Sequence, residues 1–569
     1  MNWVLPRASE EEARVLAVEL GLHPIAAKVL VARGLNVPST AAAFLSDKLS
    51  DLPDPALMKG MPETVARVHK AVKRAEKITL WGDYDVDGVC STSLLSLFLK
   101  SLSATVATYI PHRLEEGYGL NVAAIERIAQ DGTKLLVTLD CGITSHAEIA
   151  KANELGLEVV VVDHHTVPET MPPALAVLNP HQPGCTYPTK HLCAAGVTFN
   201  LCMGLRKLLR EEGFFQGRTE PNLREYLDLV ALATVADVVP LTGANRILVK
   251  HGLKELTAAK RPGVRALKEV AGLPPDGAVT AGQVGFRLGP RINAAGRLDD
   301  ASVGLRLLTC RTEDEARPLA KELDAANAER QAIEQDILNQ ALAMAEARKS
   351  ARGFVLYGEG WHPGVVGIVA SRVVEKYHRP TAVIGVKDGV GKGSARSIEA
   401  FHLYDALKNC ADHLSRFGGH KHAAGLTVDA RMLPAFTEAF EKIAAAQLTE
   451  DDLVARCRVD AIVTAQELTE SAVEAIQALA PFGNGNPEPV LGVRNVVARP
   501  RVLQNKREGG VGHLKLTLER SPMLDVIGFS MADKVALTEG PIDLVFQASM
   551  DEFRGVRRVS LKLKDVKTA

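Results

Sequence analysis

Short apolar runs that stop abruptly at acidic residues constrain the fold of this chain more than any other feature. Between residues 61 and 240, the runs ITLWG, LLVTLD and LEVVVVD alternate with segments in which apolar residues have helical spacing. Their aliphatic residues are continuous rather than interleaved with polar ones, which is typical of strands buried on both faces of a parallel sheet. This alternation of strand and helix predicts a doubly wound α/β domain.

Residues able to bind a metal stand where these apolar runs end. A single acidic residue after a strand is usually a helix N-cap or part of a solvated turn. Here four segments end in this way, including LVALATVAD at residues 229–237, and we expect them to meet at one edge of one sheet. Hard cations such as Mg²⁺ and Mn²⁺ prefer oxygen ligands and hold repelling carboxylates together. The candidates are Asp83, Asp85, Asp87, Asp140, Asp163, His164, His165 and Asp237.

Changes of pattern divide the rest of the chain. A capping box at residues 312–315 opens a stretch without glycine, which predicts one helix of about 30–37 residues, roughly 45–55 Å long. Residues 351–448 have the pattern of a second α/β lobe, and short alternating runs after residue 455 predict a small antiparallel β-barrel. We expect an N-terminal flange on the next domain (1–60), a catalytic domain (61–310), a connecting helix (311–350), a second α/β domain (351–450) and the barrel (451–569).

Three glycine-rich segments carry basic or hydroxyl side chains. Residues 289–297, GPRINAAGR, are expected to form a loop whose arginines match phosphate geometry, although a loop with purely structural arginines is the alternative. Residues 391–397, GKGSARS, and 417–425, FGGHKHAAG, are expected to be turns that grip a phosphate. The candidates are Arg291, Asn293, Arg297, Ser394, Arg396, Gly418, Gly419 and His420.

Composition excludes some classes of protein. Hydrophobic residues make up 46% and charged residues 24% of the 569 residues, as in ordinary globular proteins. No apolar run approaches the roughly 18 residues that span a membrane, and no signal peptide pattern is present, so we expect a cytoplasmic protein without a membrane partner. The net charge is −1, so any nucleic acid must bind in local grooves. Eight cysteines without a C-x-x-C pair predict reduced core thiols rather than zinc sites.

Taken together, the motifs resemble those of the DHH phosphoesterase superfamily. GDYDVDG, the strand-end Asp140, the DHH triplet at 163–165 and TVAD at 234–237 are similar to its four motifs. Over nearly its full length the chain is similar to the RecJ family of single-strand-specific 5′→3′ exonucleases. This resemblance implies a DHH-associated domain after the long helix, an oligonucleotide-binding (OB) fold in the barrel and a role in DNA repair and recombination. It also implies single-stranded DNA with a 5′ end, single-strand-binding protein and a RecQ-type helicase as partners.

The resemblance further implies roles for individual residues. Two divalent ions, Mn²⁺ or Mg²⁺, would be held by Asp85, Asp87, Asp140, His164 and Asp237. Asp140 would bridge the ions, with Asp83 as a supporting ligand. His165 would contact the phosphate or assist proton transfer, and Asp163 would orient its neighbours.

Substrate-binding roles are implied outside the acidic cluster. Arg113, Ser394 and Arg396 would bind the 5′-terminal phosphate, and the loop at 418–420 would face the substrate. In the barrel, basic and aromatic side chains either form a stacking groove or are simply a solvated face. They are Arg501, Lys506, Arg507, Lys515, Phe529, Phe553, Arg554, Arg557 and Arg558.

One departure and two rival functions qualify this interpretation. Trp81 stands four residues before Asp85, where DHH pyrophosphatases carry a metal-binding histidine, and tryptophan cannot ligate a metal. This predicts a weaker second metal site unless Asp83 compensates. A phosphoesterase acting on pyrophosphate, short oligonucleotides or cyclic dinucleotides would need neither the barrel nor the long helix. A DNA-binding scaffold without chemistry is the other rival, although all five implied ligands are present.

Overall fold

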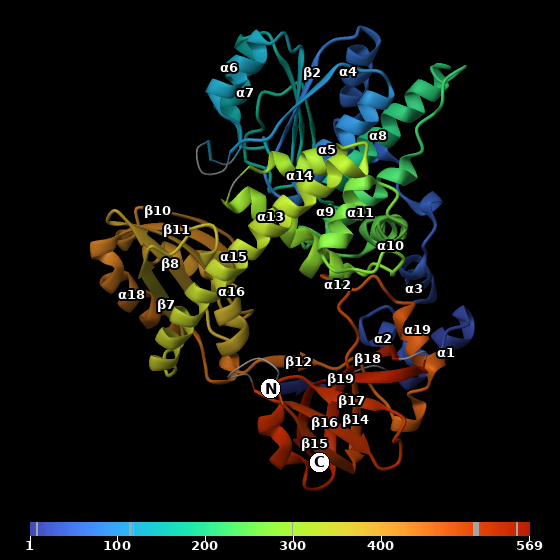
Figure 1. Cartoon of the computed structure of the whole chain (residues 1–569), viewed down its shortest axis with the longest axis vertical. Helices are drawn as coiled ribbons and strands as arrows, with labels where there is room; N and C mark the ends of the chain where they lie inside the picture. The colour runs from blue at the N-terminus through green and yellow to red at the C-terminus, as the bar shows by residue number, and fades with distance from the viewer. Residues whose placement is uncertain (7–8, 113–115, 118, 299, 505–510, 554–555) are drawn as a thin grey trace. The chain divides into compact units, whose positions relative to one another are not determined.

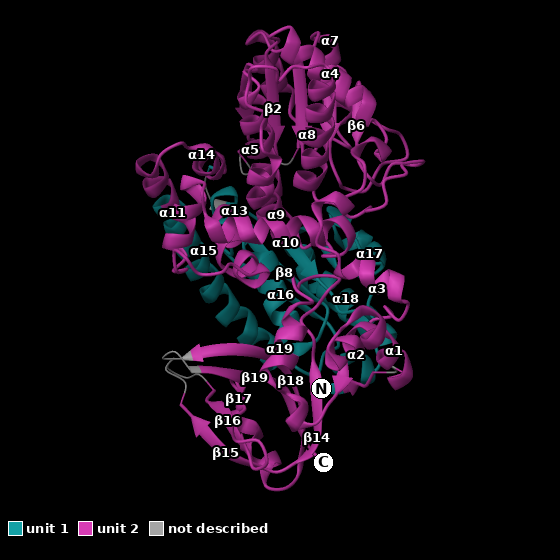
Figure 2. Cartoon of the chain, turned by 90° about the vertical axis from the view of Figure 1, so that its right-hand side faces the viewer, with its two compact units in different colours: residues 1–2, 293–300, 321–456 teal, residues 3–292, 301–320, 457–569 magenta. Residues whose placement is uncertain are grey.

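The computed structural model describes the whole chain except residues 7–8, 113–115, 118, 299, 505–510 and 554–555. The chain forms two compact units (Figure 2). The larger unit comprises residues 3–292, 301–320 and 457–569, and the smaller unit comprises residues 1–2, 293–300 and 321–456.

Two expectations from composition can be compared with the structure directly. Within the described ranges, no helix combines the length and the apolar character that crossing a membrane requires. All eight cysteines are free thiols, and all except Cys310 are buried. Seven of the eight cysteines are therefore unpaired core thiols, as expected.

The larger unit contains the predicted parallel sheet. Its strands lie in the order β3, β2, β4, β5, β6, and neighbouring strands are parallel throughout. Their bounds, in that order, are Val106–Tyr109, Ile78–Gly82, Leu135–Leu139, Glu158–Val162 and Ala176–Leu178. Strands β2 and β4 are buried at every residue, which explains why their sequences are continuous apolar runs.

Helices cover both faces of this sheet, as the doubly wound prediction requires. Figure 1 shows α6 and α7 on one face and α4, α5 and α8 on the other. The bounds of these helices are Met61–Lys73 (α4), Val86–Ser101 (α5), Val122–Gln130 (α6), His146–Glu154 (α7) and Ala194–Glu211 (α8). Contacts of α5 with both β2 and α8 place this helix directly behind the edge at which β2 ends.

The register of the sheet brings the strand ends level with one another. The last paired residues of the four central and edge strands are Gly82, Leu139, Val162 and Leu178. The backbone amides of the next residues still follow the ladder, because Asp83, Asp140 and Asp163 donate to the carbonyl oxygens of the neighbouring strands. Three of the acidic candidates therefore leave the sheet side by side.

A helical layer follows, and here two expectations are wrong. The segment ending at Asp237 is the helix α9 rather than a strand, and GPRINAAGR is the helix α13 rather than a loop. A helix buried on all sides has the same unbroken apolar sequence as a buried strand. Gly289 marks close packing rather than a turn, since a Cβ there would lie 3.3 Å from Ala236 Cβ. The bounds are Leu227–Ala236 (α9), Gly243–Ala258 (α10), Pro262–Val270 (α11), Ala281–Gln283 (α12), Gly289–Leu298 (α13) and Ser302–Thr309 (α14).

Residues 457–569, called the C-terminal domain below, form a twisted sheet of mixed direction. Its strands lie in the order β13, β14, β18, β19, β17, β16, β15. Most neighbours are antiparallel, but β13 pairs with β14, and β17 with β19, in parallel. The bounds are Ala461–Ile462 (β13), Glu470–Gln477 (α19), Leu491–Val496 (β14), Ala498–Leu503 (β15), His513–Leu518 (β16), Asp525–Gly528 (β17), Ile542–Phe553 (β18) and Val556–Thr568 (β19).

The N-terminal segment has two neighbours. Its helices α1 and α2 pack against the C-terminal domain, whereas the carbonyls of Phe44 and Leu57 accept hydrogen bonds from Arg246 and Thr186 of the next domain, as the expected flange would. Leu16 and Leu30 are fully buried in one hydrophobic cluster with Leu491 and Phe546. An amphipathic helix shows that it has a partner but not which one, so sequence order did not reveal the partner of α1 and α2. The elements of this segment are β1 (Asn2–Val4), α1 (Glu10–Leu20), α2 (Pro24–Ala32) and α3 (Pro38–Leu45).

The long helix is confirmed as α15, Glu313–Ala347, whose last part belongs to the smaller unit. The sheet of that unit has the strand order β10, β11, β9, β8, β7. GKGSARS and FGGHKHAAG were expected to be turns, but most of their residues are in strands β9, β10 and β11. Bounds are Phe354–Glu359 (β7), Val366–Tyr377 (α16), Thr381–Lys387 (β8), Val390–Arg396 (β9), Leu403–Lys408 (α17), Arg416–Gly419 (β10), Ala423–Asp429 (β11) and Leu433–Gln447 (α18). The short strand β12 (Arg456–Arg458) pairs with β1 instead.

Packing explains the glycines that suggested turns in β9. A Cβ at Gly391 would lie 2.8 Å from a methyl of Val428, and one at Gly393 would lie 2.6 Å from the Ile384 side chain. These contacts are shorter than a real Cβ tolerates, so glycine lets neighbouring strands and their side chains close over β9.

Candidate metal centre

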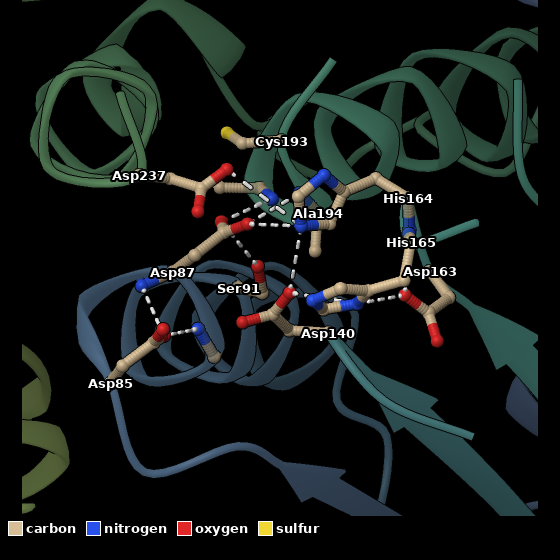
Figure 3. A network of polar contacts seen from close by, with 12 residues as sticks. Asp85, Asp87, Ser91, Asp140, Asp163, His164, His165, Cys193, Ala194 and Asp237 are labelled. Carbon is tan, nitrogen blue, oxygen red and sulfur yellow. Dashed lines mark hydrogen bonds and ion pairs between the residues drawn. The ribbon is translucent and has the colours of Figure 1, made fainter. Parts of the chain in front are cut away.

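The acidic and histidine candidates converge at the edge where β2, β4 and β5 end (Figure 3). Their ligand atoms form three overlapping groups, in each of which all atoms lie within 4.8 Å of one another. The groups are Asp83–Asp85–Asp140, Asp87–His164–Asp237 and Asp140–His164–His165. Asp140 and His164 each belong to two groups, so they occupy the middle of the cluster, which we call the metal edge.

Asp85 and Asp87 are positioned by helix termini. Asp85 is the N-cap of α5, and its Oδ1 accepts from the Asp87 and Gly88 amides at 2.9 and 3.1 Å. Asp87 is fully buried and accepts from the first amides of α8, with Oδ2 2.6 Å from Ala194 N and Oδ1 2.8 Å from Ala195 N. The positive end of α8 therefore holds the Asp87 carboxylate.

Asp140 leaves β4 in a backbone conformation that is unusual for a residue with a side chain. Its φ is +66°, in the left-handed region, which aspartate and asparagine tolerate better than most residues. Its Oδ1 lies 3.1 Å from His164 Nε2. The same nitrogen lies 3.7 Å from Asp87 Oδ2 and 3.7 Å from Asp237 Oδ2. Figure 3 shows the His164 ring pointing among these three carboxylates.

Asp163 holds the two histidines in place. Its Oδ1 accepts from the backbone amides of His164 and His165 at 2.7 and 3.1 Å, and its Oδ2 accepts from the Ile143 amide at 3.0 Å. The same Oδ1 lies 2.7 Å from His165 Nδ1, which therefore carries the proton. With its oxygens engaged in this way, Asp163 is placed to orient neighbours, in the geometry typical of residues behind a metal ligand.

The electrostatics of the metal edge fit a bound cation. Burial raises the pKa of Asp140 well above its ordinary value, and the charges of Asp87 and Asp85 raise it further. Burial, with the same two charges, raises the pKa of Asp237 to about 8. Burial lowers the pKa of His164, which favours the neutral imidazole that binds metals.

Two buried atoms at the metal edge also lack a hydrogen bond. Within the described residues, neither His164 Nε2 nor Asp237 Oδ2 makes one. Buried polar atoms are normally satisfied. A divalent ion among these ligands would satisfy them and would offset the repulsion between the carboxylates.

Trp81 belongs to the hydrophobic core and not to the ligand cluster. Its side chain is fully buried, and its ring centroid lies 4.5 Å from that of Tyr109. Asp83, which is 4% exposed, joins the ligand group of Asp85 and Asp140 on that side of the metal edge. The geometry thus allows Asp83 to supply the ligand that a histidine at position 81 would have supplied.

The phosphate-binding candidates fall into separate places. Ser394 and Arg396 lie on β9, where Arg396 Nη1 donates to Ser394 Oγ at 2.8 Å. Both approach Gly367 in the first turn of α16, because a Cβ there would lie 3.1 and 3.2 Å from their polar atoms. Arg396, Ser394 and the start of α16 therefore form a polar cluster in the smaller unit, whereas Gly418 and Gly419 are in β10 and His420 follows them. Arg113 lies outside the described residues.

The arginines of α13 are engaged with backbone carbonyls. Arg297 Nη1 donates to the Gly364 carbonyl at 2.7 Å within the smaller unit. Arg291, in the larger unit, donates to the carbonyls of Arg287 and Val270 at 2.6 and 3.2 Å. Asn293 is on the same helix. The alternative of structural arginines thus has direct support in the hydrogen bonds of this segment.

The basic residues of the C-terminal domain are partly neutralised. Lys515 pairs with Asp525 at 2.8 Å and Arg557 pairs with Glu474 at 2.7 Å. Phe529 is 50% exposed, with the Lys562 ammonium 5.7 Å from its ring centroid. Arg501 and Arg558 are exposed. Lys506, Arg507, Arg554 and the Phe553 side chain lie outside what the structure describes.

Sequence reasoning missed the residues that act through their backbone. Ala194 and Ala195 hold Asp87 through their backbone amides. Their side chains take no part in these bonds, so residue type does not indicate the role. The small residues of CAAG at 193–196 were the available signal, because they let α8 begin close against another element. Asn179 was also missed. It follows β6 and donates to the His165 carbonyl at 2.9 Å.

Comparisons with known proteins agree with this geometry. Residues 77–234 match the DHH family N-terminal domain, 350–446 the DHHA1 domain and 459–565 the RecJ OB domain. The chain is 38% identical to the single-stranded-DNA-specific exonuclease RecJ of Bacillus subtilis, covering 99% of this chain and 70% of that protein. It is 41% identical to RecJ of Dickeya dadantii, covering 91% and 92% of the two chains.

A solved structure extends the agreement to the fold. RecJ from Thermus thermophilus in complex with Mn²⁺ has a TM-score of 0.84 and 33% identity, covering 100% of this chain and 80% of that chain. The Mg²⁺ complex of that protein has a TM-score of 0.79 and 31% identity, covering 100% and 78%. Domain order, sequence and fold agree, and this chain belongs to the RecJ family.

Proposed function

We propose that this protein is a metal-dependent exonuclease that degrades single-stranded DNA from its 5′ end, releases nucleotides and acts in DNA repair and recombination. The observation that carries the proposal is the metal edge, where ligands from β2, β4, β5 and α9 converge in a chain of the RecJ family. Its relatives are named single-stranded-DNA-specific exonucleases, which supports the substrate and the reaction.

The proposed cofactor is a pair of Mn²⁺ or Mg²⁺ ions. Asp83, Asp85 and Asp140 would hold one, and Asp87, His164 and Asp237, together with Asp140, would hold the other. Carboxylate oxygens dominate both sets, as these cations prefer. When bound, such a pair lowers the pKa of a coordinated water and neutralises charge that develops on the scissile phosphate.

The chain's own residues would orient the reacting groups. Asp163 fixes the imidazole of His165 through Nδ1. The opposite edge of the ring would then contact a phosphate oxygen. The amides at the start of α8 donate to both oxygens of Asp87 and so fix the orientation of its carboxylate. No nucleophilic side chain is required, because water would attack the phosphorus.

Recognition of the 5′ end is a further part of the proposal. We propose that Ser394 and Arg396, beside the first turn of α16, bind the terminal phosphate. Arg113 is a further proposed phosphate contact. The other proposed substrate contacts are Arg291, Asn293, Arg297, Gly418, Gly419 and His420. We propose that the C-terminal domain binds the single strand farther from its end, with Phe529 stacking on a base.

The proposal includes the setting in which the protein works. We place it in the cytoplasm, where chromosomal DNA is available and where eight free thiols remain reduced. Single-strand-binding protein and a RecQ-type helicase are the proposed protein partners, since they cover and produce single strands. We retain the five-part division at residues 60, 310, 350 and 450 as the proposed domain organisation.

Degradation of end-labelled DNA tests the proposal. The purified protein is incubated with Mn²⁺ and with three substrates: a single strand labelled at its 5′ end, the same strand labelled at its 3′ end, and the blunt duplex. We expect immediate release of a labelled nucleotide from the 5′-labelled single strand, gradual shortening of the 3′-labelled one, and an intact duplex. Removal of the metal with EDTA should abolish both reactions.

Three outcomes would contradict the proposal. Release from the 3′ end first would reverse the polarity. Faster hydrolysis of pyrophosphate or a dinucleotide than of a long strand would favour the small-substrate phosphoesterase. Binding of single strands without cleavage in Mn²⁺ or Mg²⁺ would favour the non-catalytic scaffold.

A further inference from the structure

A loop of the C-terminal domain grips the backbone that follows Asp237. The loop, residues 483–486 with the sequence GNGN, lies between α19 and β14, and we call it the GNGN loop. Asn484 Nδ2 donates to the Val238 carbonyl oxygen at 2.6 Å. The Leu241 amide in turn donates to the Asn484 carbonyl oxygen at 2.7 Å. Asn484 therefore binds both ends of residues 238–241, the segment that directly follows the candidate metal ligand Asp237.

The gripped backbone is strained. Val238 has φ +59°, and a β-branched residue in the left-handed region is a genuine outlier. Its side chain is 63% exposed, so burial of the side chain does not account for the conformation. Such conformations persist only when the surroundings impose them, and they cluster at functional sites. The contact from Asn484 is directed at this residue.

The GNGN loop is shaped for close approach to this segment. Gly485 has φ +71°, and a Cβ there would lie 2.9 Å from Pro240 Cβ. A Cβ at Gly483 would lie 2.8 Å from the Leu241 side chain. Side chains at either position would push the loop away, so both glycines serve the contact between the loop and residues 238–241.

Buried hydrogen bonds also anchor the GNGN loop at Asn486. Asn486 is 1% exposed, and its Nδ2 donates to the Leu479 and Pro481 carbonyls at 3.0 and 2.8 Å. Its Oδ1 accepts from Arg33 Nη1 at 2.7 Å, and Arg33 also binds Asp460 at 2.9 Å. The N-terminal segment and the C-terminal domain thus fix the loop from both sides.

Asp237 depends on this support more than the other ligands of the metal edge do. Asp83 and Asp140 continue the hydrogen-bond ladder of the sheet, and Asp87 is held by α8. Asp237 instead ends α9, and within the described residues its buried Oδ2 has no hydrogen bond. The position of its carboxylate is therefore set by the backbone on either side of it.

We propose that Asn484 is a positioning residue for the metal centre, which holds the Val238 carbonyl and thereby keeps the Asp237 carboxylate in place for its ion. This inference goes beyond the proposed function and rests on it only in treating Asp237 as a metal ligand. The C-terminal domain, which is proposed to bind the single strand, would thus also support the metal edge through the GNGN loop.

Mn²⁺ binding in the absence of DNA provides the test. Titration calorimetry compares the full-length wild type, Asn484→Ala and a matched control, Asn153→Ala. Asn153 is also an exposed asparagine whose Nδ2 donates to a carbonyl, that of Pro173, at 2.7 Å, but on the outer helix α7. We expect Asn484→Ala to bind Mn²⁺ about tenfold more weakly, in line with losses measured behind metal ligands, and Asn153→Ala to match the wild type.

Two further readouts separate positioning from a general structural role. In DNA degradation, the Mn²⁺ concentration for half-maximal rate should rise in Asn484→Ala, whereas KM for single-stranded DNA at saturating Mn²⁺ should not change. A Val238→Gly background should reduce the effect of Asn484→Ala, because glycine adopts φ near +60° without strain. Thermal melting of the metal-free variants should agree with that of the wild type.

Wild-type Mn²⁺ affinity in Asn484→Ala would overturn the inference, as would a raised KM with unchanged Mn²⁺ affinity, which would make Asn484 a DNA contact. An undiminished effect in the Val238→Gly background would overturn the role of the strained backbone. If the wild type bound no Mn²⁺, the proposed function would fail, and the positioning role would fail with it.

Discussion

The metal edge and the outer face of the C-terminal domain differ in how firmly they hold their side chains. At the metal edge, Asp87 and Asp163 are buried, and each accepts several hydrogen bonds from backbone amides. On the C-terminal domain, Lys515 and Arg557 form surface ion pairs, which typically contribute only about 0–1 kcal/mol. From this difference we expect that replacing one residue of the metal edge strongly lowers the rate of hydrolysis. Replacing one residue on the surface of the C-terminal domain should lower DNA affinity only slightly, because many residues contribute to it.

Asp140→Asn should have the largest effect, because it removes the charge at the centre of the metal edge while asparagine tolerates φ +66°. We expect the rate of single-strand degradation to fall about 10³-fold, or about 4 kcal/mol in activation free energy. Burial and like charges raise the pKa of Asp140, so the metal-free variant should melt at a higher temperature than the metal-free wild type. End-labelled DNA and thermal melting with and without Mn²⁺ measure both effects.

Unchanged activity in Asp140→Asn would contradict the expectation that hydrolysis depends on single residues of the metal edge. Asp131→Asn, at an exposed surface position that pairs with Lys77, is the control and should leave activity and the Mn²⁺-induced rise in melting temperature unchanged.

Leu16→Ala should have the next largest effect, on stability rather than chemistry. Leu16 is fully buried in the cluster that α1 shares with the C-terminal domain. Loss of its side chain should lower the free energy of unfolding by about 3 kcal/mol. Amide hydrogen exchange should show reduced protection in β14 and β18, while Mn²⁺ affinity stays at the wild-type value.

Val18→Ala on the same helix is the matched control, since Val18 is 75% exposed. Equal effects of the two substitutions would show that the N-terminal helices do not share the core of the C-terminal domain.

Asp163→Asn tests whether the metal edge depends on residues behind the ligands. The amide cannot accept all the hydrogen bonds that orient His164 and His165. Mn²⁺ affinity should fall about 10- to 100-fold. Titration calorimetry measures the affinity, and a full loss of rate at saturating Mn²⁺ would instead indicate a direct role for Asp163 in the reaction.

Phe529→Ala should have the smallest effect and sharpens the other side of the comparison. Removing one half-exposed ring should raise KM for single-stranded DNA about fivefold, or about 1 kcal/mol, with kcat unchanged. Met523→Ala, which removes an 81% exposed side chain from the same domain, should change neither constant. A loss as large as that of Asp140→Asn would contradict the idea that affinity is distributed.

The metal edge could be predicted from sequence because a parallel sheet converts strand ends into neighbours. Asp83, Asp140 and Asp163 each follow a buried apolar run, and the register places them side by side. Asp237 was assigned to the same edge although its segment is a helix, since a fully buried helix and a buried strand have similar sequences. Asp237 therefore lies at the predicted edge, although the segment before it is a helix and not the expected strand.

Expectations based on glycine were less reliable. Glycine is a signal for turns, but Gly289 lies in a helix and Gly391 and Gly393 lie in a strand, where neighbouring groups occupy the space of a side chain. A glycine in the sequence can be required either by an unusual backbone conformation or by close packing. The sequence alone does not distinguish these two reasons. The same gap hid the GNGN loop, which had the pattern of a simple connector.

By itself, the sequence determined the fold class, the family resemblance, the long helix and the set of candidate ligands at the metal edge, because these depend on local periodicity and on strand ends. The tertiary structure alone decided that α1 and α2 complete the core of the C-terminal domain. It alone showed that α8 amides hold Asp87 and that Asn484 holds the backbone after Asp237. These contacts join segments far apart in the chain through backbone atoms and apolar surfaces, which every residue has, so no residue pattern distinguishes the partners.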